Sequence, residues 1–246
     1  MKFDQEIFKY LKGEDFSNSL TIELERTRYE SQSREVIISG LVKDSNVIHI
    51  GCADHIPLIR EKIAQNKWLH KLITDNAKKC IGIDIDRESI EFVKKETGYD
   101  NVIYGNVLTD NFPGIIGSHW DYAVFGEIVE HLDDPVHFLK TFKQRFGGSV
   151  SKFIITVPNV LNRNVYRNMV NYKEVINSDH RFWFTPYTIS KILVSAGLNP
   201  EDIIFSNLIG LSKGQLAVRK IKQLAGVKSG FPFYFFSTII VTGKLS

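Results

Sequence analysis

The sequence predicts an α/β fold in which a mostly parallel sheet has helices on both faces. Short apolar runs recur along the chain without polar alternation, as expected of strands that are buried on both sides. Stretches between them have helical spacing of apolar residues, and this alternation of strand and helix is typical of doubly wound folds. Seven strands are expected, at Val47–Gly51, Cys80–Ile85, Asn101–Tyr104, Tyr122–Phe125, Phe153–Val157, Ile203–Phe205 and Ser237–Thr242.

Composition indicates one folded domain over residues 1–246. Hydrophobic residues make up 43% and charged residues 24%, which suits a large core. The net charge of +3 gives no global indication of nucleic-acid binding. Cys52 and Cys80 are interpreted as buried thiols in a reducing compartment. Because we find neither a leader-like apolar segment nor a run of ~20 apolar residues, we expect a cytoplasmic protein without a transmembrane segment.

Three segments fall outside the strand–helix alternation. Residues 1–40 are expected to form an N-terminal helical lid. Residues 161–179 and 208–230 are interpreted as insertions on the substrate side of the sheet. The second insertion favours either a solvated amphipathic helix or an anionic acceptor site, and it leaves a peripheral membrane contact open. Its basic residues are Lys213, Arg219, Lys220, Lys222 and Lys228.

The loops that follow the first four strands carry candidate binding residues, because open parallel sheets bind ligands beyond the carboxyl ends of their strands. Gly51 ends the first strand, where backbone can approach a ligand closely. Asp84 ends the second strand, and its carboxylate can accept two hydrogen bonds from a ribose diol. Ile85 can pack on a flat base, Asn106 can meet its polar edge, and Asp86 is interpreted as a helix N-cap.

The loop after the fourth strand carries candidate catalytic residues. Glu127, Glu130 and His131 stand at positions i, i+3 and i+4, so in a helix they would share one face. Histidine is the natural base near neutral pH, and His131 is therefore the first candidate. Two alternatives stay open: Glu127 contacts only the cofactor or backbone, or Glu130 and His131 form a structural ion pair.

In their order, these segments resemble the class I S-adenosylmethionine-dependent methyltransferases over roughly residues 40–200. The stretch E-I-V-E-H-L-D-D-P at 127–135 is similar to a signature of quinone-pathway and sugar-modifying members. The resemblance implies a Rossmann-like seven-stranded methyltransferase fold, with S-adenosylmethionine as cofactor and S-adenosylhomocysteine as product. It implies methionine contacts from Gly51, Cys52, Ala53 and Asp54, ribose contact from Asp84, adenine contacts from Ile85, Asn106 and Val107, and Gly126 near the sulfonium.

The segment Ser178–Pro186 resembles a piece that returns over the active site in this family, and it brings in His180. The resemblance therefore implies a catalytic set of Glu127, Glu130, His131 and His180. Small-RNA 2′-O-methyltransferases use a similar pattern to hold a divalent metal, although no metal is expected here. The chain departs from the family at His49, where an acidic residue is usual, at Ala53 and His55, where glycine is common, and at Asn106, where Asp is usual.

The function expected from this resemblance is O-methylation of a small or carbohydrate-type acceptor, including phosphorylated ones, in surface-glycan biosynthesis. The alternatives are a quinone-type or RNA 2′-O-methyltransferase and, in a different class, a non-catalytic S-adenosylmethionine-binding protein. A nicotinamide enzyme is not favoured, because the chain has no G-x-G-x-x-G motif. The acceptor, the methylated atom and the oligomeric state are not predicted.

Overall fold

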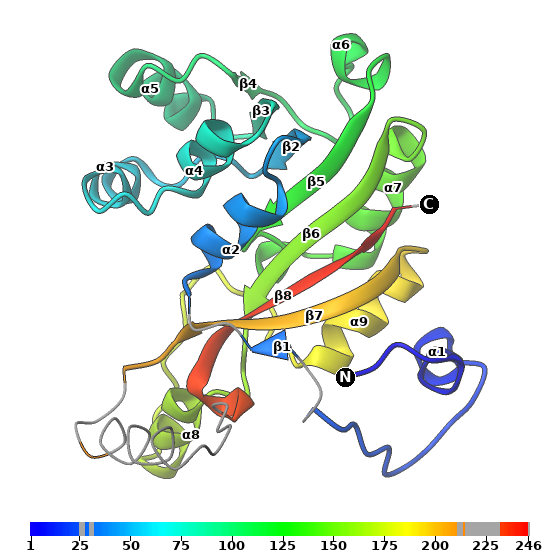
Figure 1. Ribbon diagram of the computed structural model, residues 1–246. Coiled ribbons are helices and arrows are strands. Elements are labelled where there is room, and N and C mark those ends of the chain that lie inside the picture. The colour runs from blue at the N-terminus through cyan, green and yellow to red at the C-terminus, as the bar shows by residue number, and fades with distance from the viewer. Residues whose placement is uncertain (25–27, 30–31, 211–213, 215–231, 246) are drawn as a thin grey trace, which may run out of the picture.

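Figure 1 shows the computed structural model, which describes all residues except 25–27, 30–31, 211–213, 215–231 and 246. The described residues form an eight-stranded sheet in the order β1-β7-β8-β6-β5-β2-β3-β4. Strand β8 is antiparallel to β6 and β7, and the other pairs are parallel. The strands are β1 (Arg28–Tyr29), β2 (Asn46–Ile50), β3 (Lys79–Asp84), β4 (Val102–Tyr104), β5 (Trp120–Gly126), β6 (Val150–Pro158), β7 (Asn199–Leu208) and β8 (Phe236–Lys244).

The expected α/β fold with a mostly parallel sheet is confirmed. Each of the seven predicted strands overlaps one of β2–β8, and the sequence runs were shorter than the strands chiefly at β6 and β7. The eighth strand, β1, has two residues and adds to the edge of the sheet beside β7. Strands β2, β3, β4 and β5 are parallel, so their carboxyl ends meet at one edge of the sheet.

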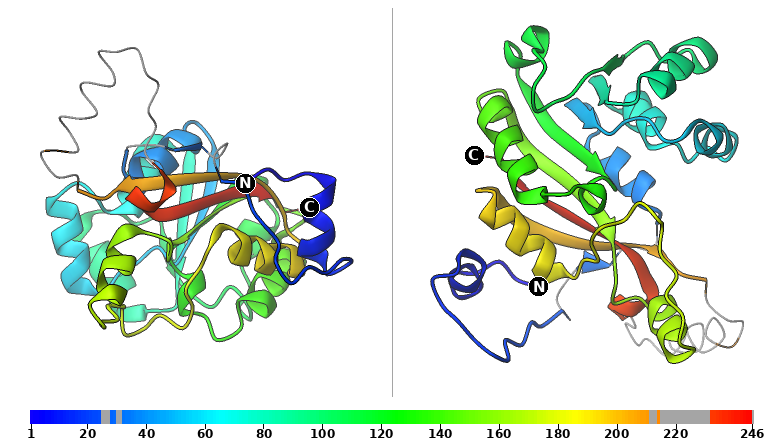
Figure 2. Two further views of the ribbon diagram at one scale, coloured as in Figure 1. Left: turned by 90° about the horizontal axis from the view of Figure 1, so that it is seen from below. Right: turned by 180° about the vertical axis from the view of Figure 1, so that it is seen from behind.

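Helices cover both faces of the sheet. Helices α7 and α9 pack on one face, as the right panel of Figure 2 shows, and α2 and α4 pack on the other. Fully buried Phe125 and Phe142 belong to the first core, and Val124 and Ile38 to the second. The helices are α1 (Gln5–Lys12), α2 (Arg34–Leu41), α3 (Ile56–Ala64), α4 (Leu69–Asn76), α5 (Arg87–Thr97), α6 (Pro113–Ile116), α7 (Pro135–Phe146), α8 (Arg163–Val170) and α9 (Pro186–Ser195), with 3-10 turns η1 (Val129–His131) and η2 (Phe233–Phe235).

The expectation of helix throughout residues 1–40 is wrong. Helix α1 ends at Gly13, whose φ of 78° is the left-handed conformation that glycine adopts readily. The residues from Glu14 to Leu24 are not helical, and the next helix among the described residues is α2, which Ser33 caps with its side chain. Helix α1 packs against α9, where the Lys191 ammonium donates to the carbonyl of Tyr10.

The two expected insertions differ in what the structure describes. Residues 161–179 contain α8 followed by an exposed loop. Of residues 208–230, the structure describes 208–210 and 214, and Leu208 is the last residue of β7. All five basic residues singled out there, from Lys213 to Lys228, lie outside the described residues. Within the described chain, every helix is too short or too polar to span a bilayer.

Candidate functional site

A cavity of about 650 Å³ opens at the carboxyl ends of β2, β3, β4 and β5. Its walls include the ends of these strands and the loops that follow them, at residues 49–55, 83–86, 105–108, 126–128 and 131–132. Arg34 of α2 lines it on one side, and Asn177, Asp179 and His180 line it on another. The cavity therefore lies where ligands bind in open α/β sheets, among the loops that the sequence singled out.

Two glycines allow backbone to form part of the cavity wall. Gly51 has a φ of 68°, and a Cβ atom there would clash with Cγ2 of Ile128. A Cβ atom at Gly126 would lie 2.6 Å from Cδ2 of Leu69 and 3.4 Å from Nε2 of His49. A side chain at either position would displace these neighbours, so glycine is required at the ends of both strands.

Asp84 is held by backbone donors at the end of β3. Its carboxylate accepts hydrogen bonds from the backbone N–H of Ala53 at 2.9 Å and of Asp86 at 3.0 Å. Burial raises the pKa of Asp84, and these donors oppose the shift. Asp86 caps α5 through Glu88 and Ser89 backbone N–H groups, as expected from the sequence. Beside it, Ile85 leaves 71% of its surface exposed in the cavity wall.

The loop after β4 is a tight turn around Asn106. The Asn106 side-chain oxygen accepts from the backbone N–H of Leu108 at 2.9 Å. The backbone N–H of Asn106 donates to the Asp110 carboxylate at 2.9 Å. Val107 is buried in this turn. Residues 105–108 of this turn line the cavity, and Asn106 uses its side-chain oxygen and its backbone N–H for hydrogen bonds within the turn.

The remaining residues predicted around the first loop have different surroundings. Cys52 is buried, and burial raises the pKa of its thiol well above the usual value, so the thiol is protonated near neutral pH. Asp54 forms an ion pair with Lys62 of α3, at 2.7 Å. Ala53 contributes the backbone donor to Asp84. His55 is largely exposed and lies 3.9 Å from Asp179.

Arg34 is a site residue that the sequence analysis missed. The residue is 5% exposed, and its guanidinium lies 2.6 Å from the carboxylate of Glu127. Burial lowers the pKa of Arg34, but the charges of Glu127 and Glu35 outweigh that effect and raise it overall. A signal was present: Arg34 is the first residue of α2, where the helix dipole disfavours a cation. A buried cation at that position therefore has a purpose other than helix stability.

Glu127 is directed toward Arg34 by an unusual backbone conformation. Its φ of 59° is rare for a residue with a side chain, and its N–H donates to the hydroxyl of Thr156 at 3.1 Å. The segment after it is a three-residue 3-10 turn, η1, and not the α-helix that would place Glu127, Glu130 and His131 on one face. The Glu127 carboxylate is therefore directed to Arg34 and is not one of the groups that converge with Glu130, His131 and His180, although its charge acts on Glu130.

Glu130, His131 and His180 converge into one cluster. Candidate ligand atoms of these three residues all lie within 4.8 Å of one another. The rings of His131 and His180 meet edge to face at 4.7 Å, and Nε2 of His180 lies 4.0 Å from the Glu130 carboxylate. Among the described residues, neither carboxylate oxygen of fully buried Glu130 has a hydrogen-bond partner.

The protonation of this cluster follows from its burial. Burial, reinforced by the negative charge of Glu127, raises the pKa of Glu130 to about 8. Burial and the neighbouring His131 lower the pKa of His180. At neutral pH, Glu130 is therefore mostly a neutral acid and His180 a neutral imidazole. A permanent ion pair between Glu130 and His131 is accordingly not favoured.

A second pair of histidines lies beneath the cavity floor, and sequence reasoning assigned it no role. Nδ1 of His49 is 3.3 Å from Nδ1 of His70, so one ring donates and the other accepts. Burial lowers the pKa of both imidazoles, well below the usual value for His49 and to about 4 for His70. Nε2 of His49 has no hydrogen-bond partner among the described residues, although His49 lines the cavity.

Comparison with known proteins gives a family and a fold. A family model described as a methyltransferase domain matches residues 26–203, more than half of the chain. A search of curated proteins found no match.

Several solved structures share the fold. One is an S-adenosylmethionine-dependent methyltransferase, possible histamine N-methyltransferase, of Thermotoga maritima, with TM-score 0.54, 15% identity and coverage of 87% of this chain and 88% of that one. Another is the YcgJ protein of Bacillus subtilis, with TM-score 0.51, 12% identity and coverage of 85% and 97%. A third is the small RNA methyltransferase HEN1, with TM-score 0.52, 14% identity and coverage of 93% and 27%. At these identities, the likeness concerns the fold.

Proposed function

The chain belongs to the methyltransferase domain family and is an S-adenosylmethionine-dependent methyltransferase, and we propose that it methylates a hydroxyl oxygen of a small or carbohydrate-type acceptor. The observation that carries this proposal is the cluster of Glu130, His131 and His180, of which His131 and His180 line the cavity and Glu130 is buried behind them. A hydroxyl acceptor must lose a proton as it is methylated, and this cluster offers two imidazoles for that purpose. Acceptors in surface-glycan biosynthesis, with phosphorylated sugars among them, are the ones that we favour.

The cavity residues fit the cofactor, which supplies a methyl group on a sulfonium. The exposed side chain of Ile85 offers an apolar wall to adenine, and the turn at Asn106 and Val107 offers polar backbone to its edge. The Asp84 carboxylate keeps lone pairs for the ribose hydroxyls beside its two backbone donors. The backbone from Gly51 to Asp54 would follow the methionine moiety, and Gly126 would lie near the sulfonium.

Arg34 and His49 extend this site toward the methionine end. A buried guanidinium is suited to a carboxylate, so Arg34 would pair with the carboxylate of the cofactor. His49 is neutral, and its unpartnered Nε2 can accept a hydrogen bond from the cofactor ammonium when its Nδ1 donates to His70. In this proposal, His49 provides as a neutral acceptor what an acidic residue commonly provides in the family.

His131 is the proposed base. Glu130 is mostly protonated at neutral pH and cannot take a proton from the acceptor. His131 lines the cavity and is half-buried, which leaves one face of its ring to an acceptor. His180 holds that ring from the side through their edge-to-face contact. A positioned base of this kind contributes about 10²–10⁴-fold to the rate.

The proposal is tested by measuring S-adenosylhomocysteine release with purified protein and an acceptor panel. The panel contains free hexoses, sugar phosphates and nucleotide sugars, with quinols and 3′-terminal RNA duplexes as the competing classes. Turnover with a sugar class alone supports the proposal, whereas turnover with RNA or quinols alone contradicts the proposed acceptor. Cofactor binding without turnover on any acceptor would instead support a non-catalytic S-adenosylmethionine-binding protein.

A divalent cation is a second candidate for the same cluster. The observation that favours it is the pair of unpartnered Glu130 oxygens facing two imidazoles within ligand distance of each other. Mixed oxygen and nitrogen ligands suit Mn²⁺ or Mg²⁺, and such a cation can chelate a sugar diol. Glu127 is not part of this ligand set, because its carboxylate is engaged with Arg34. Calorimetric titration of the protein with Mn²⁺ tests cation binding without depending on turnover.

A further inference from the structure

Exposed apolar side chains concentrate on and beside α8. Of the sixteen large apolar residues that are exposed in the described chain, eight lie between Leu161 and Phe182. Six of them form what we call the α8 surface: Tyr166, Met169, Val170, Tyr172, Val175 and Ile176. Contiguous exposed apolar groups of this kind mark interaction sites on proteins, whereas single ones do not.

Helix α8 contributes nothing to the core. None of its eight residues is buried, although its apolar side chains lie on one side of the helix. The helix starts at a side-chain cap, where Asn162 accepts from the backbone N–H groups of Asn164 and Val165. Its apolar side is therefore ordered by local hydrogen bonds and presented to the outside.

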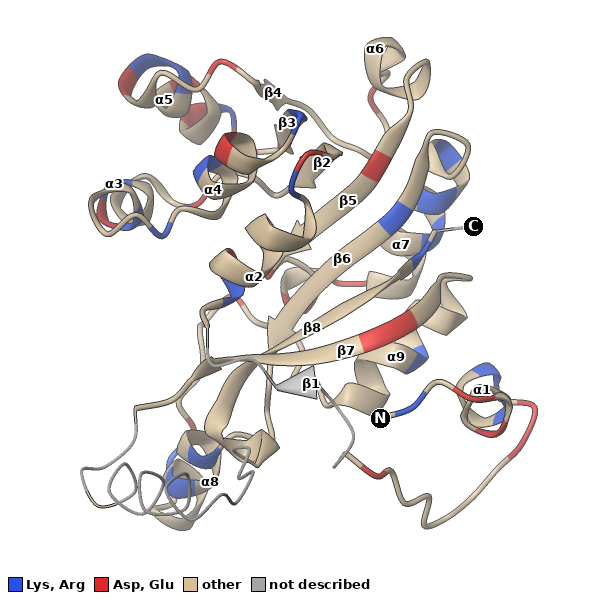
Figure 3. Cartoon of the chain, in the orientation of Figure 1, with Lys and Arg blue, Asp and Glu red and all other residues tan. Residues whose placement is uncertain are grey.

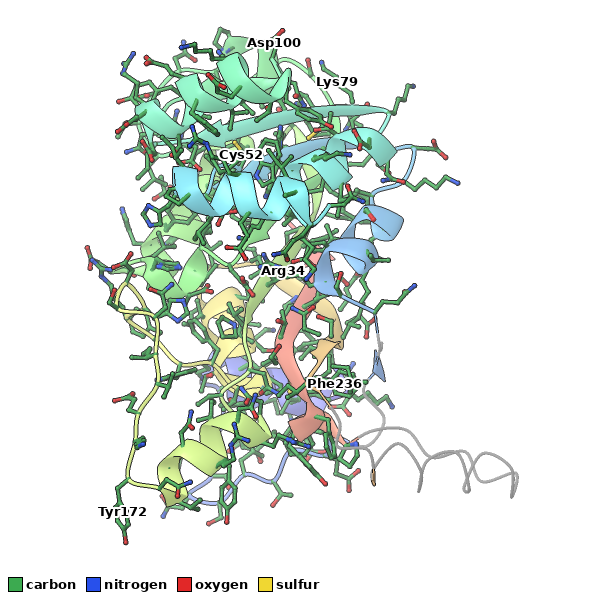
Figure 4. All side chains as sticks on the ribbon, turned by 90° about the vertical axis from the view of Figure 1, so that its left-hand side faces the viewer. Arg34, Cys52, Lys79, Asp100, Tyr172 and Phe236 are labelled. Carbon is green, nitrogen blue, oxygen red and sulfur yellow. The ribbon has the colours of Figure 1, made fainter. Side chains whose placement is uncertain are left out.

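The end of α8 holds an aromatic ring away from the molecule. Tyr172 occupies the left-handed position after the helix, with φ 56°, where glycine is usual. Its N–H donates to the carbonyl of Met169, and the N–H of Lys173 donates to the carbonyl of Asn168. The ring is 99% exposed, and Figure 4 shows it projecting from the tip of this segment. A strained backbone that exposes a tyrosine favours a binding role over a packing role.

Positive charge accompanies the α8 surface. Arg163 and Arg167 lie on the helix and Lys173 follows it, and Figure 3 shows α8 with basic residues and no acidic one. The acidic residues of the following loop face other groups: Glu174 accepts from the indole N–H of Trp183, and Asp179 lies beside His55. The surface thus combines apolar side chains with cations, which is complementary to anionic headgroups above an apolar layer.

We propose that the α8 surface docks the protein on an anionic lipid membrane. Apolar side chains would enter the headgroup boundary, while Arg167 and Lys173 would meet the phosphates. The segment that carries Val175 and Ile176 leads directly into Asn177, which lines the cavity. Docking would therefore hold one segment of the cavity wall close to the lipid surface. Where it concerns the acceptor, this inference rests on the proposed function. The acceptor would then be an amphiphilic molecule held in the membrane.

Vesicle co-sedimentation tests the docking with the full chain. The lipids are phosphatidylglycerol mixed with phosphatidylcholine, compared with phosphatidylcholine alone, at physiological salt. The variants are Tyr166→Ser/Met169→Ser/Tyr172→Ser and Arg167→Glu/Lys173→Glu, and the matched control is Phe16→Ser/Ile116→Ser, which changes exposed apolar residues elsewhere. We expect binding to the anionic vesicles only, and about a tenfold or greater loss of partitioning in both α8 variants but not in the control.

Several outcomes would overturn this inference. They are no vesicle binding by the wild-type chain, equal binding to neutral vesicles, or α8 variants that bind like the control. A shift from dimer to monomer in the Tyr166→Ser/Met169→Ser/Tyr172→Ser variant would instead assign the surface to a second copy of this chain. Calorimetry with S-adenosylhomocysteine on every variant verifies folding, and it also separates the two proposals. Intact cofactor binding without vesicle binding refutes only the docking.

Discussion

Arg34 Nη1 and Glu127 Oε2 lie 2.6 Å apart and join α2 to the loop after β5 across the cavity wall. The Arg34 side chain is 7% exposed and that of Glu127 33%, and both residues line the cavity. Figure 4 labels Arg34 where α2 faces the middle of the sheet. An incoming carboxylate would share the guanidinium with Glu127, which links cofactor binding to the position of the catalytic loop.

Arg34→Met is therefore expected to weaken S-adenosylhomocysteine binding. Hydrogen bonds between charged groups contribute about 1.5–3 kcal/mol, so the dissociation constant should rise roughly tenfold to a hundredfold. The dissociation constant of Arg34→Lys should lie between those of Arg34→Met and the wild type. An ammonium keeps the positive charge but lacks the two parallel N–H donors of a guanidinium. Calorimetry measures both. The control ligand is 5′-methylthioadenosine, which has no carboxylate, and an equal loss of its affinity would mean that Arg34 acts only on folding.

Asp84→Ala is expected to weaken binding of S-adenosylhomocysteine and 5′-methylthioadenosine alike. Both ligands carry the ribose diol that would donate to this carboxylate, and two charge-assisted bonds imply about a tenfold or larger effect. NAD should not bind to either protein. Unchanged calorimetric affinity in Asp84→Ala would remove Asp84 from the site and leave it the structural role of accepting from Ala53 and Asp86.

His49→Phe is expected to show the same ligand preference as Arg34→Met. It removes the acceptor Nε2 while keeping an aromatic ring against His70, so it should weaken S-adenosylhomocysteine about tenfold and leave 5′-methylthioadenosine almost unchanged. His49→Asn restores an acceptor oxygen and should recover part of the loss. If both ligands weaken equally in isothermal titration, His49 only fills space beneath Gly126.

Glu130 predicts a pH dependence of stability. The pKa of this group is about 8 in the folded protein, against an ordinary value of 4.5. The folded state therefore holds the proton more tightly, and this contribution is complete below pH 4.5 and is lost as pH rises through 8. Glu130→Gln should remove this dependence and stabilise the protein at high pH by on the order of a few kcal/mol.

Denaturant unfolding of wild type and Glu130→Gln between pH 5 and pH 9 measures this difference. Glu91→Gln, at an exposed position of α5, is the matched control. Parallel pH curves for wild type and Glu130→Gln would show that Glu130 is ionised in the folded protein. A saturating divalent cation should also flatten the wild-type curve if the cluster holds one, because the cation favours the carboxylate.

The fold could be predicted because its buried strands carry a local signal. Runs such as Tyr122–Phe125 are apolar on both faces, and this pattern is visible without any tertiary information. The same holds for Thr185 and Pro186, whose cap and first-turn roles at α9 follow from their order in the sequence. The break in residues 1–40 was not predicted, because a single glycine such as Gly13 can stand inside a helix as well as at its end. Strand β1 has two residues and is too short to give a pattern.

The places of the site residues in the sheet could be predicted from the sequence, but the side chains with which they pair could not. Strand ends located Gly51, Asp84 and Gly126, because parallel topology brings consecutive loops together. Helical spacing misplaced Glu127, since its left-handed backbone interrupts the periodicity on which that reasoning depends. The pairing of Glu127 with Arg34 joins residues that are far apart in the sequence, so no local pattern predicts it.

His131→Ala is expected to lower kcat by about 10²–10⁴-fold without changing cofactor affinity, because a hydroxyl acceptor with a pKa far above 7 must lose its proton during transfer.

Two mechanisms predict this loss of turnover in His131→Ala, and they differ in the effect of EDTA and in the affinity for Mn²⁺. If His131 acts as a base alone, EDTA has no effect on turnover. If Glu130, His131 and His180 hold a cation, EDTA abolishes turnover, Mn²⁺ or Mg²⁺ restores it, and Glu130→Gln lowers Mn²⁺ affinity as His131→Ala does. Glu127→Gln discriminates further: as a partner of Arg34 it should alter S-adenosylhomocysteine binding and spare Mn²⁺ binding. Full activity in His131→Ala would contradict both mechanisms and would mean that the acceptor arrives already ionised, so that positioning in the cavity accounts for the rate.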